Sequence, residues 1–218
     1  MGRDEIQREH WRLASASIEG GSLEILGFQV MQAWEHPLMS AMAAAVVPVP
    51  GEGHVLEVGY GLGISADMIQ AHHPARHWII EANAELAVAA RKRFRREIEE
   101  ARVTVIEAFW EDVVPLKGAC FSGILFDTYP LRASERRKNH FPFFPHAARM
   151  LIPGGTFTYF SDELDSLSRD HQRRLLAAFG SSVTIRLETI HVAPTADCRY
   201  WHSDQILHVA VQPARGRP

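Results

Sequence analysis

The stretch VLEVGYGLGIS, residues 55 to 65, decides the fold that this sequence predicts. It begins as an apolar strand pattern, and Gly59, Gly61 and Gly63 then alternate with other residues before a helical pattern begins at Ile64. Glycines allow the backbone to turn tightly and to lie against a ligand without a steric clash. The spacing is GxGxG and not the GxGxxG of dinucleotide-binding folds. Taken alone, the turn therefore also fits a purely structural connection between a strand and a helix.

Strand and helix patterns alternate along the rest of the chain. Strands are expected at residues 54–58, 77–81, 103–107, 123–127 and 155–160, and helices at residues 64–73, about 84–99, about 140–151 and about 167–179. Two long strands at residues 182–192 and 205–212 close the chain and indicate an antiparallel addition at one sheet edge. This alternation predicts an α/β fold with a mostly parallel sheet covered by helices on both faces.

The residues before this alternation form a distinct opening segment. Its pattern is helical around residues 37–46, and VPVPGEG at residues 47–53 ends that helix. We therefore expect one domain overall, in which residues 1–50 are a helical lid and substrate cap and residues 51–218 bind the ligand.

Composition and spacing exclude several functions. The 218 residues carry a formal net charge of -3, which offers no broad basic field for nucleic acid. The basic run at residues 91–102 interleaves acids with bases at helical spacing, which is typical of a solvated helix face. Cys120, Cys198 and the twelve histidines lack metal-ligand spacing, so no metal is expected. Without an apolar run of membrane length or a secretory signal pattern, we expect no membrane partner and a cytoplasmic location.

Two further features follow the strands whose carboxyl ends form the binding crevice of such sheets. Glu81 ends the second strand, where a carboxylate can accept hydrogen bonds from both hydroxyls of an adenosine ribose. It can instead cap the next helix, a role that Asn83 can also take. In AFWED, residues 108–112, Trp110 can stack on an adenine and Glu111 or Asp112 can read its amino edge, although an isolated loop tryptophan more often serves packing.

These features in strand order resemble the class I S-adenosylmethionine-dependent methyltransferases, and Glu57 and LIPGG at residues 151–155 belong to the same pattern. A closer resemblance, to the guanidinoacetate N-methyltransferase family, runs from about residue 26 to about residue 202. It is carried by VMQAWEHPLMSAMA, VLEVGYG, HWIIEAN, WEDV, GILFDTYPL, PGGTFTY and ADCRYW. The resemblance implies a Rossmann-like fold with a seven-stranded sheet in the order 3-2-1-4-5-7-6, and S-adenosylmethionine as the methyl donor.

The resemblance also implies roles for individual residues. The implied cofactor contacts are Trp11, Met31 and Met39 from the opening segment; Tyr60, Gly61, Leu62, Gly63, Ile64 and Ser65 around the methionine part; Glu81 and Asn83 at the ribose; Trp110 and Glu111 at the adenine; and Asp127 beside the cofactor. Glu35 and Asp127 are the implied catalytic residues, and they would grip a guanidino group.

The chemistry explains why such a reaction needs two acids. A guanidinium has a pKa above about 12, has no lone pair to spare and repels a cationic sulfonium. Two carboxylates bind its planar fork through charge-assisted hydrogen bonds, and one can take up the proton as the nitrogen attacks. Because Asp127 ends a core strand, we expect it to accept the proton while Glu35 orients the substrate. The alternatives are an Asx turn at Asp127 and a solvated helix acid at Glu35.

The turn after the fifth strand departs from the family. Family members present a mostly uncharged turn there, whereas this chain has Ser161, Asp162 and Glu163, which we assign to substrate binding. Two acids suit a substrate that also carries an ammonium, such as free L-arginine. If they point outward or cap the next helix, guanidinoacetate, peptidyl arginine or another guanidine is the alternative. A non-catalytic S-adenosylmethionine-binding scaffold stays open as a different class of function, and a homodimer stays open as the assembly.

Overall fold

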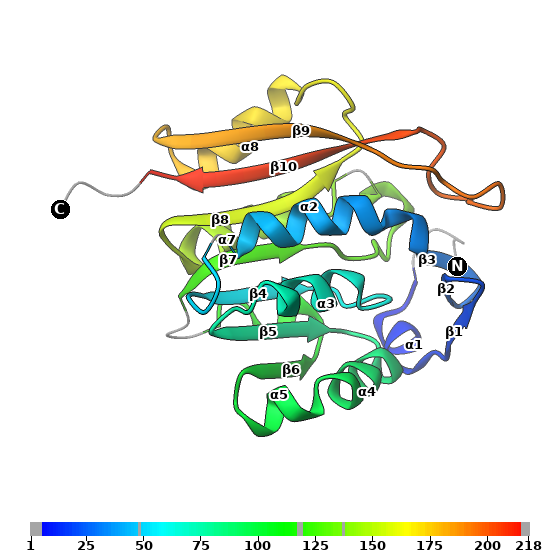
Figure 1. Ribbon diagram of the computed structural model, residues 1–218. Helices are drawn as coiled ribbons and strands as arrows, with labels where there is room; N and C mark the ends of the chain where they lie inside the picture. Colours follow the sequence, from blue (N-terminus) through cyan, green and yellow to red (C-terminus); the bar gives the residue numbers. More distant parts are fainter. Residues whose placement is uncertain (1–5, 48, 117–119, 137, 215–218) are drawn as a thin grey trace.

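The computed structural model describes residues 6–47, 49–116, 120–136 and 138–214, and its centre is a seven-stranded sheet (Figure 1). The sheet strands are β4 (His54–Val58), β5 (Arg76–Glu81), β6 (Val103–Glu107), β7 (Phe121–Phe126), β8 (Leu151–Ser161), β9 (Val183–His191) and β10 (Gln205–Pro213). Their order across the sheet is β6-β5-β4-β7-β8-β10-β9. When the strands are counted from β4 as the first, this order reads 3-2-1-4-5-7-6.

The strand directions confirm a mostly parallel sheet with an antiparallel edge. The ladders that join β6, β5, β4, β7 and β8 are parallel. β10 pairs antiparallel with β8 on one side and with the whole length of β9 on the other. The chain therefore places its last strand inside the sheet and leaves β9 as the edge.

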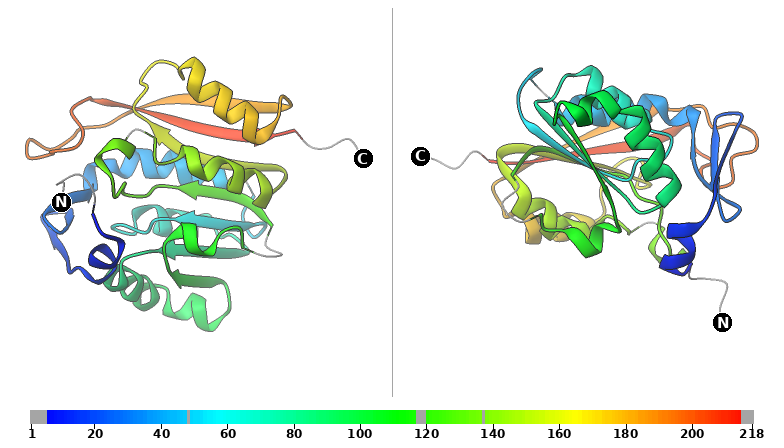
Figure 2. Two further views of the ribbon diagram at one scale, coloured as in Figure 1. Left: turned by 180° about the vertical axis from the view of Figure 1, so that it is seen from behind. Right: turned by 90° about the horizontal axis from the view of Figure 1, so that it is seen from below.

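Helices cover both faces of the sheet, as the alternating pattern predicts. One face carries α2 (His36–Val46), α3 (Ile64–Ala71), α4 (Ala84–Arg93) and α5 (Arg95–Glu99), and the other carries α7 (Phe144–Met150) and α8 (Arg169–Phe179), as Figure 2 shows. The single turn α6 (Trp110–Val113) follows β6. None of the helices in the described ranges is long and apolar enough to cross a membrane.

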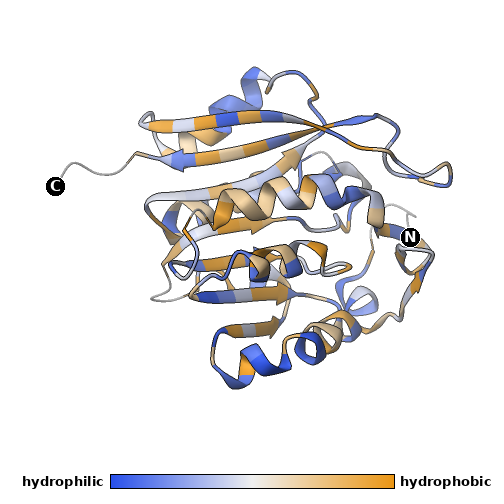
Figure 3. Cartoon of the chain, viewed as in Figure 1, coloured by the Kyte–Doolittle hydropathy of each residue, from blue (hydrophilic) through white to orange (hydrophobic). Residues whose placement is uncertain are grey.

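Alternating side chains of the central strands divide into two cores. Val55 of β4 and Leu125 of β7 belong to the core beneath α2, α3 and α4. Leu56 and Val58 of β4, with Ile124 of β7, belong to the core beneath α7 and α8. Because both faces are buried, the strands are nearly continuous apolar runs, and Figure 3 shows this as hydrophobic colour along the centre of the sheet.

The helix expected at residues 84–99 is interrupted. Phe94 leaves helical geometry, and its buried ring lies edge-on to His77 at a centroid distance of 6.5 Å. Beyond this break, α5 has the solvated character expected of residues 91–102, with ion pairs of 2.9 Å between Arg95 and Glu99 and between Arg96 and Glu100.

The expectation of a helical lid over residues 1–50 is wrong for most of that segment. Between α1 (Arg8–Leu13) and the turn η1 (Ala33–Glu35), the chain forms an antiparallel sheet of β1 (Ala16–Glu19), β2 (Ser22–Ile25) and β3 (Phe28–Gln32). Its two loops have two residues each, Gly20-Gly21 and Leu26-Gly27, and all four have positive φ. Such loops match the twist of hairpin strands, so these dipeptides determine the hairpins. Within this segment, the helix expected around residues 37–46 is present as α2.

Gly123 lets α2 approach the sheet closely. A Cβ built on this glycine of β7 would lie 2.2 Å from the carbonyl oxygen of Val46, at the end of α2. Backbone cannot move away as a flexible side chain can, so this contact sets the distance between helix and sheet.

We predict that Gly123→Ala lowers the free energy of unfolding by about 1–3 kcal/mol, because overpacking forces the backbone of α2 to shift. The neighbouring Ser122→Ala is the control, since it removes only one exposed hydrogen bond, to the carbonyl of His54, and should cost about 1 kcal/mol or less. Urea denaturation of both variants measures the difference, and equal stability of the two would show that α2 does not rest on Gly123.

Candidate active site

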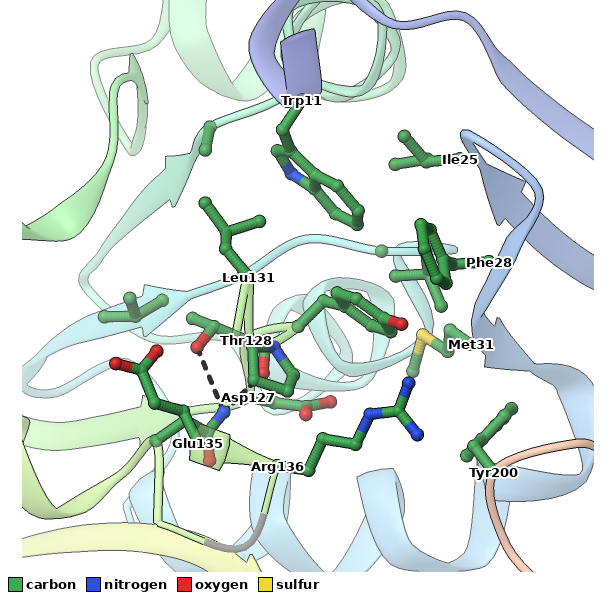
Figure 4. Close-up of a pocket in the computed structure, with 18 of the residues that line it drawn as sticks. Trp11, Ile25, Phe28, Met31, Asp127, Thr128, Leu131, Glu135, Arg136 and Tyr200 are labelled. Atoms are coloured by element: carbon green, nitrogen blue, oxygen red, sulfur yellow. Dashed lines mark hydrogen bonds between the residues drawn. The ribbon is translucent and has the colours of Figure 1, made fainter. Parts of the chain in front are cut away.

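A cavity of about 1470 Å³ lies beyond the carboxyl ends of β4, β5 and β7. The chain goes from β4 outward in both directions, so this is the point where the strand order reverses and where ligands bind in such sheets. Its wall is formed by the opening segment, by the segments that follow β4, β5, β6, β7 and β8, and by the connection between β9 and β10. Figure 4 shows side chains from the opening segment, the loop after β7 and the connection between β9 and β10 around one space.

In the turn after β4, the positions of Gly59 and Gly61 are packed too closely for a side chain. A Cβ on Gly59, whose φ is 95°, would lie 1.8 Å from the backbone oxygen of Asp127. A Cβ on Gly61 would lie 2.7 Å from Sδ of Met31, and the amide of Leu62 lies 3.4 Å from the same sulfur. The turn therefore brings Asp127 and Met31 to its two sides while its own backbone remains at the cavity.

Glu57 holds the turn from inside the sheet. This fully buried carboxylate accepts a hydrogen bond from the hydroxyl of Ser65, at the start of α3. Its other oxygen lies 2.9 Å from Nε2 of the buried His77, in the neighbouring strand β5. Ser65 lines the cavity, but its hydroxyl is engaged by Glu57.

Glu81 lies at the cavity wall with backbone donors on both oxygens. Oε2 accepts from the amide of Tyr60 at 2.9 Å and Oε1 from the amide of Asn83 at 2.7 Å. Burial raises the pKa of Glu81, and these backbone hydrogen bonds lower it. The backbone of Gly61 and Ala82 also contributes hydrogen bonds to this carboxylate. The contact of Glu81 with a ribose stays a prediction.

Asn83 serves as a structural connection. Its Oδ1 accepts from the amide of Leu86 at 3.1 Å and caps α4, which leaves Glu81 without that role. Its Nδ2 donates to the carbonyl oxygens of Trp11 and Ala14, at 2.9 and 2.8 Å, and so ties the opening segment to the sheet. The side chain does not line the cavity, so the predicted cofactor contact of Asn83 is indirect in this structure.

The turn after β6 meets the cavity with Trp110 and Glu111. The Trp110 ring packs edge-on against Phe126 and Phe143, with centroid distances of 5.9 and 5.2 Å, so the packing alternative describes most of its contacts. Burial raises the pKa of Glu111, whereas Asp112 pairs with Arg8 at 2.6 Å. Stacking of an adenine on Trp110 stays a prediction.

The opening segment supplies Trp11 and Met31 to the wall, but not Met39. The buried Trp11 stacks on Tyr129 with ring centroids 5.0 Å apart, and Met31 lies beside the end of the Arg136 side chain in Figure 4. Met39 is fully buried in the core under α2 and is not among the wall residues, so its contact with the cofactor stays a prediction. Three residues of the glycine turn that were assigned to the cofactor also lie outside the wall: Leu62, Gly63 and Ile64.

Asp127 faces the cavity directly after β7. Its backbone amide donates to the carbonyl of Val58 at 2.9 Å, which continues the pairing of β7 with β4. No described residue donates a hydrogen bond to its carboxylate, so the Asx-turn alternative finds no support. Burial, and then the charge of Glu57, raise the pKa of Asp127 to about 6.

Glu35 reaches the same cavity from η1, and only 5% of it is exposed, so it is not a solvated helix acid. Its Oε1 accepts from the amide of Gln32 at 2.8 Å and from the hydroxyl of Tyr200 at 2.5 Å. Burial, and then the charge of Asp127, raise the pKa of Glu35 to about 8, while these hydrogen bonds lower it. The electrostatic contact with Asp127 shows that both acids act on one space.

The side chains of the acidic turn after β8 do not all reach the cavity. Ser161 and Asp162 line the cavity. Glu163 does not: its Oε2 accepts from the amide of Ser168 at 2.9 Å and lies 3.0 Å from Nδ1 of His171, and these contacts lower its pKa against the effect of burial. Glu163 therefore holds the start of α8 in this structure, which is the helix-capping alternative, and a substrate role for it stays a prediction.

Among the wall residues that the sequence did not predict are Phe28, Tyr129, Arg136 and Tyr200. Tyr129 and Tyr200 lie in DTYPL and ADCRYW, so the blocks that carried the resemblance contained the signal. Arg136 lies in a basic loop whose position at the cavity no pattern reveals. In Figure 4 its side chain points toward Met31 and Tyr200.

Comparisons with solved structures agree with this fold. Spermidine synthase from Thermotoga maritima superposes with a TM-score of 0.65 at 14% identity, covering 94% of this chain and 74% of that one. The O-methyltransferase TomG from Streptomyces achromogenes, in complex with S-adenosylmethionine, gives a TM-score of 0.55 at 17% identity, covering 84% of this chain and 82% of that one. At such identities the likeness establishes the fold alone, the Rossmann-like fold of class I methyltransferases.

Three curated relatives at higher identity carry the name protein arginine N-methyltransferase 2. The protein from Eremothecium gossypii is 28% identical over 198 residues, which are 82% of this chain and 46% of the relative. Those from Emericella nidulans and Aspergillus oryzae are 38% and 41% identical over 103 residues, each 46% of this chain and 24% of the relative. The chain thus spans less than half the length of these relatives.

A family model covers almost the whole sequence. The model described as guanidinoacetate N-methyltransferase matches residues 1–213, which include every part of the cavity wall. Members of this family use S-adenosylmethionine, the neighbour TomG binds it, and the open glycine turn and the buried acceptor Glu81 fit that cofactor. The chain belongs to the guanidinoacetate N-methyltransferase family of S-adenosylmethionine-dependent methyltransferases.

Proposed function

We propose that this chain methylates a guanidino nitrogen held between Glu35 and Asp127. The observation that carries the proposal is the acid pair: two carboxylates from distant parts of the chain line one cavity, and no described cation pairs with either. Both acids have pKa values raised by burial, so their ionised forms are poorly stabilised by the protein alone. A planar cation with several N–H donors is the ligand that stabilises such a pair.

The residues around the glycine turn would hold the cofactor. The backbone at Gly59 and Gly61 lies open to the cavity, Glu81 can accept from the ribose hydroxyls, and Trp110 and Glu111 can bound the adenine. When bound, S-adenosylmethionine supplies an electrophilic methyl group on a cationic sulfur.

The two acids would orient the substrate and take its proton. Carboxylates on one side of the guanidinium fix which nitrogen points away from them, toward the methyl donor. They also offset the repulsion between two cations in a cavity from which water is partly excluded. With a pKa of about 6, Asp127 is mostly ionised at neutral pH, whereas Glu35, with a pKa of about 8, is mostly protonated before a cation binds. Asp127 is therefore the acid ready to accept a proton when the nitrogen attacks.

Isosteric amides test these roles. We predict that Asp127→Asn lowers kcat by about 100-fold or more, because general-base contributions are typically of that size. Glu35→Gln should mainly raise KM for the guanidino substrate, since we assign it to orientation. Thermal shift with S-adenosylhomocysteine should show unchanged cofactor binding in both variants.

The outcomes separate the alternatives. A near wild-type kcat for Asp127→Asn would refute the assignment of Asp127 as proton acceptor. A wild-type chain that binds S-adenosylhomocysteine but methylates no guanidino compound would support the scaffold function instead.

The raised pKa values also predict how activity depends on pH. A neutral carboxyl cannot neutralise a guanidinium, so the active form of the free enzyme appears as pH rises through the pKa values of about 6 and about 8. We expect log kcat/KM to rise with pH in two steps around these values and then to level off, because kcat/KM reports the free enzyme. Each amide variant should lose one step. A profile that is flat or falling between these values would contradict the proposal.

The remaining wall suggests what else the substrate carries. Asp162 is an acid that an ammonium could meet, and the side chain of Arg136 points into the cavity, where a carboxylate could meet it. Free L-arginine carries both groups, whereas guanidinoacetate carries only the carboxylate. We therefore propose free arginine ahead of guanidinoacetate. The relatives named protein arginine N-methyltransferase 2 favour an arginine guanidino group as well, and they keep peptidyl arginine as the second candidate.

Substrate analogues separate these candidates. We predict that Asp162→Asn raises KM for free arginine several-fold, because an ion pair to the ammonium is lost, and changes KM for guanidinoacetate less. The assay compares methylation of arginine, guanidinoacetate and N-acetylarginine amide by mass spectrometry. Turnover of guanidinoacetate well above that of arginine would end the preference for arginine, and efficient turnover of the blocked amide would favour peptidyl arginine.

A further inference from the structure

We propose that Tyr200 is a positioning residue that selects which oxygen of Glu35 meets the substrate and eases the ionisation of that acid. The proposal rests on the proposed function of Glu35, and it adds a residue to which no role is assigned. Tyr200 lies in the connection between β9 and β10, 165 residues beyond Glu35 in the chain.

Both protein donors to Glu35 converge on the same atom. Oε1 accepts from the amide of Gln32 at 2.8 Å and from the hydroxyl of Tyr200 at 2.5 Å. No described residue donates to Oε2. Because Glu35 lines the cavity, Oε2 is the oxygen left for an N–H of the substrate. Without the Tyr200 hydroxyl, Oε1 would keep only one donor, and rotation of the carboxylate would exchange the two oxygens.

The ring of Tyr200 is held in place by a second aromatic ring. It stacks on Trp34 with a centroid distance of 5.8 Å and an interplanar angle of 27°. Trp34 lies in η1 next to Glu35, and its Nε1 donates to Oε1 of Gln32 at 2.7 Å. The hydroxyl therefore approaches Glu35 from a ring whose position is set by the same turn that carries the acid.

The connection that carries Tyr200 is bound to the opening segment at further points. The amide of Arg199 donates to Oε1 of Gln29 at 2.7 Å, and Nε2 of Gln29 donates to the carbonyl of Asp197 at 3.1 Å. The hydroxyl of Thr195 donates to Oε1 of Gln32 at 3.2 Å. These contacts hold the connection between β9 and β10 against β3. The position of Tyr200 beside Glu35 is therefore fixed by several hydrogen bonds of that connection.

The electrostatic effect of the hydroxyl has a definite sign. The titratable and charged groups that face Glu35 and Tyr200 include Asp127, after β7, Cys198, in the same connection as Tyr200, and Arg136, whose side chain points toward Tyr200 in Figure 4. Burial and Asp127 raise the pKa of Glu35, and the hydrogen bond from Tyr200 lowers it. Burial and the nearby Glu35 raise the pKa of Tyr200 well above its ordinary value, so the tyrosine remains a donor at every working pH.

Tyr200→Phe tests the proposal, because it keeps the ring on Trp34 and removes only the hydroxyl. A hydrogen bond to a carboxylate is worth about one to two pKa units, so the Glu35 titration should move to higher pH by that amount. We measure it by carbon NMR of the glutamate carboxyl groups, with Glu35→Gln identifying the Glu35 resonance. In the pH profile of kcat/KM the upper step should move equally, so activity at pH 7 falls about tenfold and recovers at alkaline pH.

Thr195→Val is the matched control. It removes a hydroxyl of the same connection that bonds to the same turn but does not touch Glu35, and it lies outside the cavity wall. Its Glu35 titration should match wild type. A general loosening of the connection would instead shift both variants alike and would overturn the specific role of Tyr200.

A second substitution keeps the test decisive if Tyr200→Phe does not fold. Tyr200→3-fluorotyrosine has almost the same shape and a more acidic hydroxyl, so it should lower the Glu35 titration midpoint. A midpoint unmoved by either substitution overturns the proposal. The NMR measurement needs no turnover, so failure of the wild-type chain to methylate guanidines would reject the proposed function while the role of Tyr200 is still decided.

Discussion

The contact between the glycine turn and the strand end at Asp127 is the constraint on which the site depends. The turn after β4 passes so close to the backbone oxygen of Asp127 that no Cβ fits at Gly59. The amide of Asp127 in turn continues the pairing of β7 with β4. A cofactor lying along the turn is therefore adjacent to the acid by construction, because the two strands that carry them are neighbours in the sheet. Orientation that precedes binding is what methyl transfer needs, since it proceeds in line.

Around this contact, the chain ends are brought together to complete the acid pair. Glu35 comes from the turn after β3, and its carboxylate is held by the amide of Gln32 and by Tyr200, from the connection between the last two strands. The opening segment is tied to the central sheet separately, through Asn83. Under the proposed function, the first and last parts of the sequence hold Glu35, while the end of β7 presents Asp127, so the substrate would lie between the outer parts of the chain and the sheet. A change in the outer parts would leave the glycine turn as it is.

Much of this arrangement could be predicted from the sequence, because apolar periodicity determines the strands and the rule for parallel sheets places their carboxyl ends together. Glu81 and Asp127 lie at the cavity for that reason. The expectation of a helical lid fails on short-range turn geometry, because Gly20-Gly21 is a hairpin signal. Side-chain direction is not contained in the strand and helix pattern either: the side chain of Met39 enters the core, and that of Glu163 holds the start of α8.

The raised pKa values of the acid pair bear both on substrate binding and on proton transfer. A carboxylate solvated by water would bind a guanidinium weakly and would be a poor base, whereas burial makes the ionised pair unstable until a cation arrives. Binding of a guanidinium would then release the proton held by Glu35 at neutral pH, so charge is exchanged and not simply added. Under the proposed function, transfer of the nitrogen's proton to Asp127 would return the pair toward the protonated state that burial favours. The same desolvation that selects a cationic substrate would therefore help to take the proton that methylation must remove.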